Sequence, residues 1–252
     1  MLEYTPLQRL RQFASRLPGA ARLYDRLRLT FAATYREDGL VTTHNCDFTK
    51  DPAFRAAYAS GEKQQTMDGI RWRAHTALWA AFHAKQLEGD FVECGVYRGF
   101  LSTSIMTYID FASMTDRKFH LIDTYSGLVP ELVTEEDSAA YRNDYEDCYE
   151  FVKQSFAKYE NVIVVRGSVP EILPSANISK VAYLSIDMNC TQPEVDALEY
   201  FWPRLVSGGV VVLDDYGFPG HEAQKAGADR VAESVGVQVL TLPTGQGLII
   251  KP

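Results

Sequence analysis

Apolar and polar positions follow two different periods from about residue 68 to the end of the chain. Short apolar runs bounded by turn residues predict strands, at 90–95, 118–123, 161–167, 181–187 and 209–215, with a closing hairpin of 237–242 and 247–252. Apolar residues spaced three or four positions apart predict helices, at 68–85, 99–112, 148–159, 193–205 and 221–236, with a short helix beginning at "VPEILP".

Strands that alternate with helices through short connections indicate an α/β fold. The sheet of such a fold is mostly parallel, and its right-handed crossovers place helices on both faces. The closing hairpin adds antiparallel strands, so we expect a Rossmann-like, seven-stranded, mostly parallel sheet. Ligands of such sheets bind beyond the carboxyl ends of the strands, and the residues at those ends are therefore the candidates for function.

Acidic residues stand at four of the five expected carboxyl ends. The residues at these ends are Glu93 with Gly95, Asp123, Gly167 with Ser168, Asp187, and the adjacent pair Asp214 and Asp215. Core packing does not call for carboxylates there, and neighbouring like charges repel. Two interpretations stay open at this point. Either the acids converge on a cation, or Asp187 and Asp215 each cap the helix that follows.

The first 60 residues differ from the rest in pattern and charge. They are helical or irregular, and the first 30 carry six arginines against two acids. We expect an amphipathic helix pair interrupted at Pro18-Gly19, packed on the main domain or on a second subunit. A targeting peptide or membrane-surface helix is the alternative. The predicted organisation is an N-terminal extension over 1–60, with a contact for a homo-oligomer, and a main domain over 61–252.

Composition narrows the class of partner. The net charge of −8 and the acidic balance argue against a nucleic-acid-binding protein, and no apolar run approaches the length of a membrane span. The four cysteines are far apart and lack zinc-site spacing. We therefore expect a cytoplasmic protein with free thiols and a small-molecule partner. The acidic run 131–150 is expected to be a solvated helix or a mobile lid.

The turn after the first expected strand, "ECGVYRGF", is neither a dinucleotide fingerprint nor a phosphate-binding loop. It suits a ligand without a pyrophosphate, although ordinary strand-to-helix geometry explains it equally. Asp123 follows about 28 residues after Gly95, where an acid commonly accepts hydrogen bonds from ribose hydroxyls. A helix-capping Asp is the alternative.

Four segments together resemble the macrocin O-methyltransferase family, which methylates sugar hydroxyls of antibiotics. They are "GDFVECGVYRGF", "LIDTYSGL", "VRGSVPEILP" and "LSIDMNCTQPEVDALEYFWPRLVSGGVVVLDDYGFPGHEAQKAGADRV". The resemblance runs from about Thr66 to the C-terminus. It implies that residues 61–252 form a class I methyltransferase domain that uses S-adenosylmethionine.

The resemblance also implies roles for the residues that bind the cofactor. Glu93, Gly95 and Tyr97 would hold its methionine end, Asp123 its ribose, and Gly167 and Ser168 its adenine. Thr66 and Met67, in "QTMDGIRWR", would close over it. The adenine and lid roles rest on the resemblance alone.

A divalent metal, normally Mg²⁺, is expected at Asp187, Asp214 and Asp215. The family binds it through these positions, and the chemistry agrees, because hard cations prefer carboxylate oxygens. A metal lowers the pKa of a hydroxyl, and a carboxylate can then accept its proton. The resemblance and this chemistry predict Asp187 as both base and metal ligand. For both Asp214 and Asp215 to bind, a turn must begin at that point.

Several positions depart from the family pattern or remain open. Asn189 replaces a second Asp, "CTQPE" replaces an aromatic-acid-proline stretch, and Phe100 replaces a Gly; these changes affect the wall that faces the acceptor. His221 is a candidate second base or a surface histidine. The expected function is methylation of a sugar hydroxyl on a natural product or glycoside. A catechol-like acceptor and a catalytically silent cofactor-binding module are the alternatives.

Overall fold

The computed structural model describes residues 20–67, 69–137 and 145–252. The strands are β1 (Tyr35–Glu37), β2 (Leu40–Thr42), β3 (Asp90–Cys94), β4 (Phe119–Asp123), β5 (Val162–Arg166), β6 (Val181–Ile186), β7 (Leu205–Leu213), β8 (Leu240–Thr241) and β9 (Gly247–Ile250). The α-helices are α2 (Ala20–Phe31), α3 (Pro52–Glu62), α4 (Arg71–Ala84), α5 (Phe100–Ile109), α6 (Tyr149–Phe156), α7 (Thr191–Phe201) and α8 (Glu222–Ser234). Short 3₁₀ turns are η1 (Asp47–Lys50), η2 (Phe111–Ser113), η3 (Pro130–Leu132), η5 (Leu173–Ala176) and η6 (Trp202–Arg204).

Within the described residues, seven strands form one sheet in the order β5-β4-β3-β6-β7-β9-β8. The strands from β5 to β7 pair in parallel, whereas β9 runs antiparallel to both β7 and β8. The predicted Rossmann-like sheet with its C-terminal hairpin is therefore confirmed. The strand order reverses direction between β3 and β6, and this is the point at which open parallel sheets bind ligands.

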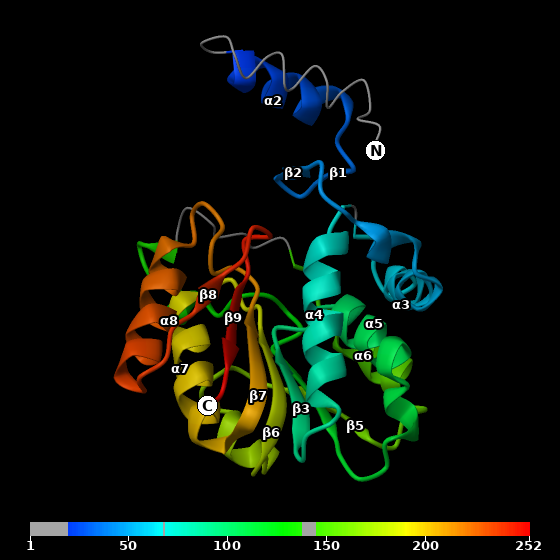
Figure 1. Ribbon diagram of the computed structural model, residues 1–252. Coiled ribbons are helices and arrows are strands. Elements are labelled where there is room, and N and C mark those ends of the chain that lie inside the picture. The colour runs from blue at the N-terminus through cyan, green and yellow to red at the C-terminus, as the bar shows by residue number, and fades with distance from the viewer. Residues whose placement is uncertain (1–19, 68, 138–144) are drawn as a thin grey trace. The chain divides into compact units, whose positions relative to one another are not determined.

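Helices cover both faces of the sheet. In Figure 1, α4 and α5 lie on one side of the sheet and α7 and α8 on the other. The central strands are buried on both faces, which explains why they read as continuous apolar runs; every residue of β6 is buried. No helix in the described part of the chain is long and apolar enough to cross a membrane.

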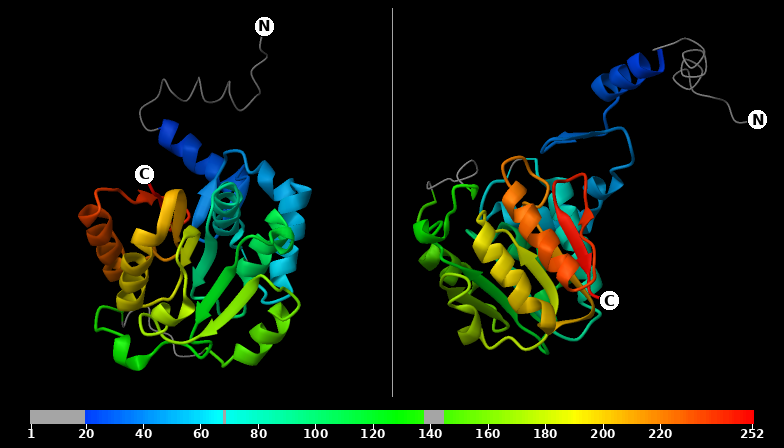
Figure 2. Two further views of the ribbon diagram at one scale, coloured as in Figure 1. Left: turned by 90° about the horizontal axis from the view of Figure 1, so that it is seen from below. Right: turned by 90° about the vertical axis from the view of Figure 1, so that its left-hand side faces the viewer.

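The hydrogen-bond ladder continues one residue beyond the strand ends. The backbone N–H of Asp187 donates to the carbonyl of Cys94 (2.8 Å), and that of Asp214 donates to the carbonyl of Ile186 (2.9 Å). At Gly95, a Cβ would lie 1.7 Å from the carbonyl oxygen of Asp187, so no side chain fits there. The turns after β3, β6 and β7 are therefore held against one another. Figure 2 shows the sheet and the helices on its two faces from two further sides.

The end of β7 differs from its expected position. The strand ends at Leu213, and Asp214 and Asp215 lie in the bend that follows it. The turn that both carboxylates require therefore begins at the expected point. The segment "VPEILP" contributes to η5, a 3₁₀ turn, where a short helix was predicted.

The chain divides into two compact units, Met1–Thr49 and Lys50–Pro252. Helix α3 lies in the second unit, whereas the sequence placed it in the extension. In the first unit, β1 and β2 form a hairpin within a segment predicted to be irregular. Asp38 and Gly39 both have positive φ at its turn, the backbone that Asp-Gly favours. The helix expected before Pro18 lies outside the described residues, as do positions 138–144 of the acidic run.

Candidate functional site

A cavity of about 280 Å³ opens at the carboxyl edge of the sheet. It is lined by residues from the turns after β3, β4, β5, β6 and β7, and by the segment before α4. The predicted site residues among its lining are Met67, Glu93, Gly95, Tyr97, Asp123, Gly167, Ser168, Asp187, Asp214 and Asp215. Strand ends that are up to 120 residues apart in the sequence therefore meet around one space, as the parallel topology requires.

Two of the predicted site residues, Thr66 and His221, are not among the described residues that line the cavity. Thr66 is exposed. Nδ1 of His221 lies 3.9 Å from Oδ2 of Asp215. The same Nδ1 donates to Oε1 of Gln224 (3.0 Å). Burial lowers the pKa of His221, and the Gln224 hydrogen bond opposes this.

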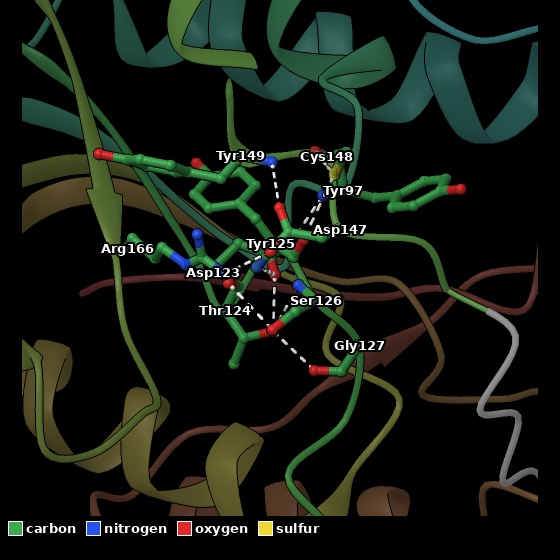
Figure 3. A network of polar contacts seen from close by, with 10 residues as sticks. All are labelled: Tyr97, Asp123, Thr124, Tyr125, Ser126, Gly127, Asp147, Cys148, Tyr149 and Arg166. Atoms are coloured by element: carbon green, nitrogen blue, oxygen red, sulfur yellow. Dashed lines mark hydrogen bonds and ion pairs between the residues drawn. The ribbon is translucent and has the colours of Figure 1, made fainter. Parts of the chain in front are cut away.

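Asp123 organises the turn between β3 and α5. Its Oδ2 accepts hydrogen bonds from the backbone N–H of Val96 (2.6 Å) and Tyr97 (2.7 Å), and its Oδ1 accepts one from the N–H of Tyr125 (2.7 Å). Figure 3 shows Asp123 at the centre of this network. Both Tyr97 and Tyr125 have positive φ, which costs energy for a residue with a Cβ. The carboxylate therefore stabilises an otherwise unfavourable turn.

The start of α6 is bonded to the same turn. The Sγ of Cys148 donates to the carbonyl of Tyr97 (3.3 Å), and the N–H of Cys148 donates to the carbonyl of Tyr125 (2.9 Å). Beside it, Asp147 accepts from Tyr149 N–H (3.1 Å) and pairs with Arg166 (2.5 Å; Figure 3). Tyr97 and Tyr125, which line the cavity, are thus each bonded through their carbonyl groups to the start of α6.

Glu93 is a buried acid at the end of β3, with 2% of its surface exposed. Its Oε2 accepts a hydrogen bond from the hydroxyl of Ser102 (2.6 Å). Burial raises the pKa of this carboxyl to about 8; the Ser102 bond opposes the shift, and the charges of Asp123 and Asp214 add to it. A carboxyl in this state is suited to pairing with a cationic ligand group, which would restore its charge.

The second acidic group lies at the ends of β6 and β7. One oxygen from each of Asp187, Asp214 and Asp215 lies within 4.8 Å of the others. Burial raises the pKa of Asp187 and of Asp215 well above the usual range, and the neighbouring carboxylates add to it. Among the described residues, nothing donates a hydrogen bond to the buried Oδ2 of Asp215.

Glu194 on α7 holds the backbone that follows Asp187. It accepts a hydrogen bond from the N–H of Met188 (3.0 Å). Burial raises its pKa to about 8, against the effect of that bond. A buried carboxylate oxygen without a donor is costly, and three convergent carboxylate oxygens form the donor set that Mg²⁺ prefers. The residues present therefore fit a hard divalent cation.

Two polar residues that contact Asp214 were not identified from the sequence. Nη1 of Arg73 donates to Oδ2 of Asp214 (2.6 Å), and Nε2 of Gln246 donates to its Oδ1 (2.8 Å). Arg73 stands three positions after Ile70 on the apolar face of α4. A charged residue on an apolar helix face is unusual, and this could have identified Arg73 from the sequence. Gln246 lies in the hairpin turn "PTGQ" and carried no such signal.

The segment after β4 forms an apolar wall. Leu128, Val129 and Leu132 line the cavity there. The segment ends on Asp137, which is 1% exposed and whose Oδ1 accepts hydrogen bonds from the N–H (3.1 Å) and hydroxyl of Thr191. Thr191 belongs to "CTQPE", where the sequence departs from the family pattern. Thr191, which departs from the family pattern, therefore anchors this wall. Asn189 is a second departure from the pattern, and it also lines the cavity.

The family model of macrocin O-methyltransferases, TylF, matches residues 28–233. The chain belongs to the macrocin O-methyltransferase family. The resemblance inferred from its four segments is confirmed by this match, which covers most of the chain.

Two relatives of this family member are O-methyltransferases. The chain is 27% identical over 161 residues to the 8-demethyl-8-(2,3-dimethoxy-alpha-L-rhamnosyl)-tetracenomycin-C 4'-O-methyltransferase of Streptomyces olivaceus, covering 60% of this chain and 59% of that protein. It is 24% identical over 144 residues to the mycinamicin III 3''-O-methyltransferase of Micromonospora griseorubida, covering 52% and 56%. The chain thus spans somewhat more than half the length of these relatives.

The solved structure of the O-methyltransferase NovP shares the fold of this macrocin O-methyltransferase family member. The TM-score is 0.65 at 19% identity, and the similarity covers 91% of this chain and 98% of that chain. Together with the strand order, this identifies the Rossmann-like class I methyltransferase fold.

Proposed function

We propose that the chain is an S-adenosylmethionine- and Mg²⁺-dependent O-methyltransferase that acts on a sugar hydroxyl of a natural product or glycoside. The observation that carries this proposal is the convergence of Asp187, Asp214 and Asp215 in one cavity. Glu93 and the turn held by Asp123 line the same cavity, in a member of the macrocin O-methyltransferase family.

The cofactor would lie along the turns after β3, β4 and β5. Its α-ammonium group fits the buried carboxyl of Glu93, because that pairing removes the cost of an isolated buried charge. Asp123 retains limited acceptor capacity for ribose beside the three N–H groups that it already binds. Gly95 and Tyr97 would complete the methionine end, Gly167 and Ser168 the adenine end, and Thr66 and Met67 a cover over it.

When bound, S-adenosylmethionine supplies an electrophilic methyl group, and a divalent cation lowers the pKa of a hydroxyl held against it. The chain's own residues position the acceptor and remove its proton. Asp187 follows β6, which pairs with both β3 and β7, and its carboxylate is the proposed acceptor of the hydroxyl proton. His221, beside Asp215, is the proposed second base.

The acceptor would lie against Leu128, Val129 and Leu132. A cavity lined both by an apolar wall and by a group of carboxylates suits a ring with one apolar face and neighbouring hydroxyls, as in a deoxysugar. The name of the Streptomyces olivaceus relative includes a rhamnosyl group, and this favours a sugar over a catechol-like acceptor. A cytoplasmic location and a homo-oligomer formed through residues 1–60 are also part of the proposal.

Methyl transfer from labelled S-adenosylmethionine tests the proposal directly. The assay compares a panel of rhamnosyl and other deoxysugar glycosides with catechols, in Mg²⁺ and in excess chelator. We expect transfer to a glycoside that is lost in chelator and restored by Mg²⁺. Full transfer in chelator would refute the metal requirement, and preference for a catechol would refute the acceptor class. Binding of S-adenosylhomocysteine without turnover on either class would identify a silent cofactor-binding module.

A further inference from the structure

The segment 127–137 connects the two halves of the sheet at its carboxyl edge. It follows β4, and its far end is bonded to the start of α7, which follows β6. Strands β4 and β6 pair with β3 on its two sides, so this segment crosses the line of β3, where the strand order reverses. We call residues 127–137 the bridging segment. Its residues Leu128, Val129 and Leu132 are the apolar wall of the cavity.

The bridging segment is bonded to the domain at both ends. At its start, the hydroxyl of Thr124 donates to the carbonyl of Gly127 (2.6 Å). Near its other end, the thiol of Cys190 donates to the carbonyl of Leu132 (3.3 Å). Cys190 comes three positions after Asp187. The apolar wall is therefore bonded to the loop that carries the proposed proton acceptor.

The carboxylate of Asp137 makes the strongest contacts at that end. Its Oδ1 accepts hydrogen bonds from the N–H (3.1 Å) and the hydroxyl of Thr191. Its Oδ2 accepts from the N–H and the hydroxyl of Thr134 (both 2.9 Å). Burial alone would raise the pKa of this carboxyl, but the hydrogen bonds from Thr191 and Thr134 lower it below its usual value. These donors therefore keep the buried side chain ionised.

Asp137 also caps α7 from a distant part of the sequence. The N–H of Thr191 is one of those that a helix leaves unpaired in its first turn, and a negative charge at that end is favourable. Cys190, which stands directly before the helix, is not a preferred capping residue. One side chain thus fixes both the start of α7 and the end of the bridging segment.

We propose that Asp137 is a positioning residue that sets the place of the apolar wall relative to Asp187 and so determines which acceptors the cavity binds. This inference rests on the proposed function and deepens it. Asp137 is not among the described residues that line the cavity, so it acts through the wall and through Thr191. Affinity for the acceptor depends on Asp137, whereas the chemical step depends on Asp187.

Asp137→Asn tests the proposal with almost no change in side-chain volume. Each oxygen of Asp137 accepts from a backbone N–H, so an amide must turn its own NH₂ group toward one of them. That N–H loses its partner, and the anchor weakens. We expect the KM of the acceptor to rise about tenfold, while kcat and the affinity for S-adenosylhomocysteine stay within about threefold of the wild type.

The assay is methyl transfer from labelled S-adenosylmethionine to para-nitrophenyl rhamnoside, or to another glycoside of the panel if the wild-type protein prefers it. Losses in kcat and in S-adenosylhomocysteine affinity without a rise in KM would show a general structural role and overturn the proposal. A wild-type protein that methylates no glycoside refutes the proposed function instead.

Thr191→Val and Thr191→Ser form a matched pair of variants. Val keeps the shape of Thr but lacks the hydroxyl that Asp137 accepts, whereas Ser keeps the hydroxyl. The KM of the acceptor should rise about fivefold in Thr191→Val and stay within about twofold of the wild type in Thr191→Ser. Glu136→Gln is the charge control, because Glu136 is exposed beside Asp137, and it should leave KM unchanged. Equal KM values in the two Thr191 variants would contradict the anchoring role.

Hydrogen–deuterium exchange tests the anchor without an acceptor. With S-adenosylhomocysteine present, peptides over 128–137 should exchange at least about tenfold faster in Asp137→Asn than in the wild type, while β6 exchanges at the same rate in both. Unchanged exchange over 128–137 overturns the anchor, and faster exchange with an unchanged KM overturns its role in acceptor binding. If Asp137→Asn does not fold, the Thr191 pair gives the same two measurements.

Discussion

Acids at two neighbouring edges of the same cavity are held in opposite ways. At the end of β4, Asp123 accepts three backbone N–H bonds of 2.6 to 2.7 Å. At the ends of β6 and β7, Asp187 and Asp215 face other carboxylates, and burial raises the pKa of both. The sequence pattern, an acid directly after a buried strand, is the same in each case.

The difference lies in what the surrounding backbone offers. The turn after β3 directs its N–H groups at Asp123, so that charge is compensated inside the protein and stabilises the turn. No comparable set of donors among the described residues reaches Asp187 and Asp215, so their charge is available to an external cation. An acid at a strand end thus acts as a structural anchor or as a ligand according to the donors around it.

The largest effect that would test this contrast is expected for Asp187→Asn. Methyl transfer should fall about a thousandfold, because the proposed proton acceptor, which is also a proposed metal ligand, is lost. Binding of S-adenosylhomocysteine should stay within about threefold, since the residues proposed to bind the cofactor are unchanged. Calorimetric titration and single-turnover assays measure the two quantities. Equal losses of binding and turnover would show that Asp187 holds the cofactor instead.

The same variant should be more stable than the wild-type protein at pH 7 in the absence of metal, because Asn places no uncompensated charge in this buried position. The pKa of Asp187 is raised in the folded state, so its contribution to stability falls as the pH rises above its unfolded pKa. The advantage of Asn should therefore disappear below about pH 4, where the carboxyl is protonated in both states. Urea unfolding at the two pH values measures this.

The next effect concerns Asp123→Asn, and its sign should be opposite. An amide presents one acceptor oxygen, so at least one of the N–H groups of Val96, Tyr97 and Tyr125 loses its partner. We expect a loss of about 2 kcal/mol in the free energy of unfolding at pH 7, together with weaker binding of S-adenosylhomocysteine. Asp116→Asn is the matched control, because Asp116 is exposed and pairs with its neighbour Arg117; it should change stability by less than about 0.5 kcal/mol. Equal stability of the two variants would contradict the anchoring role.

The smallest effect is a proton count at Glu93. With a pKa of about 8 in the ligand-free protein, Glu93 is mostly protonated at pH 7. Pairing with the ammonium group of S-adenosylhomocysteine should lower that pKa and release roughly 0.9 of a proton. Titrations in buffers of different ionisation enthalpy measure the release. Glu93→Gln should bind without it, and an unchanged release in that variant would place the titrating group elsewhere.

Glu93 also predicts how the stability of the ligand-free protein depends on pH. Its folded pKa of about 8 lies above the value of 4.5 expected for the unfolded chain. The folded state therefore binds more protons in this range, and stability falls as the pH rises from about 4.5 to 8. Glu93→Gln should flatten that part of the profile, which thermal unfolding across the range would reveal.

Much of this arrangement could be predicted because it depends on local patterns. A run such as Val210–Leu213 must be buried, and parallel strands bring their carboxyl ends to one edge. The positions of Asp187, Asp214 and Asp215 follow from these two facts. A short helix was predicted where the 3₁₀ turn η5 lies. The hairpin of β1 and β2 was missed, although Asp38-Gly39 carried the turn signal.

The partners of those acids could not be predicted, because they come from distant parts of the chain. Arg73 precedes Asp214 by 141 positions and Gln246 follows it by 32. No pattern in the sequence states which residue of α4 or of the final hairpin reaches that carboxylate. For Asp123 the same limit applies: backbone N–H groups leave no trace in the sequence, so an anchor and a ribose ligand look alike.

Backbone hydrogen bonds between neighbouring strands continue past the strand ends, and they fix the distances between residues at the carboxyl edge of the sheet. Asp187 and Asp214 are registered to the neighbouring turns by backbone bonds, so their separations follow from the spacing between strands, about 4.8 Å. Substitution of side chains cannot change these backbone distances. Under the proposed function, acceptors of different sizes would be accommodated by the segments that line the cavity beyond the strand ends. In this chain, the apolar wall that ends at Asp137 is such a segment.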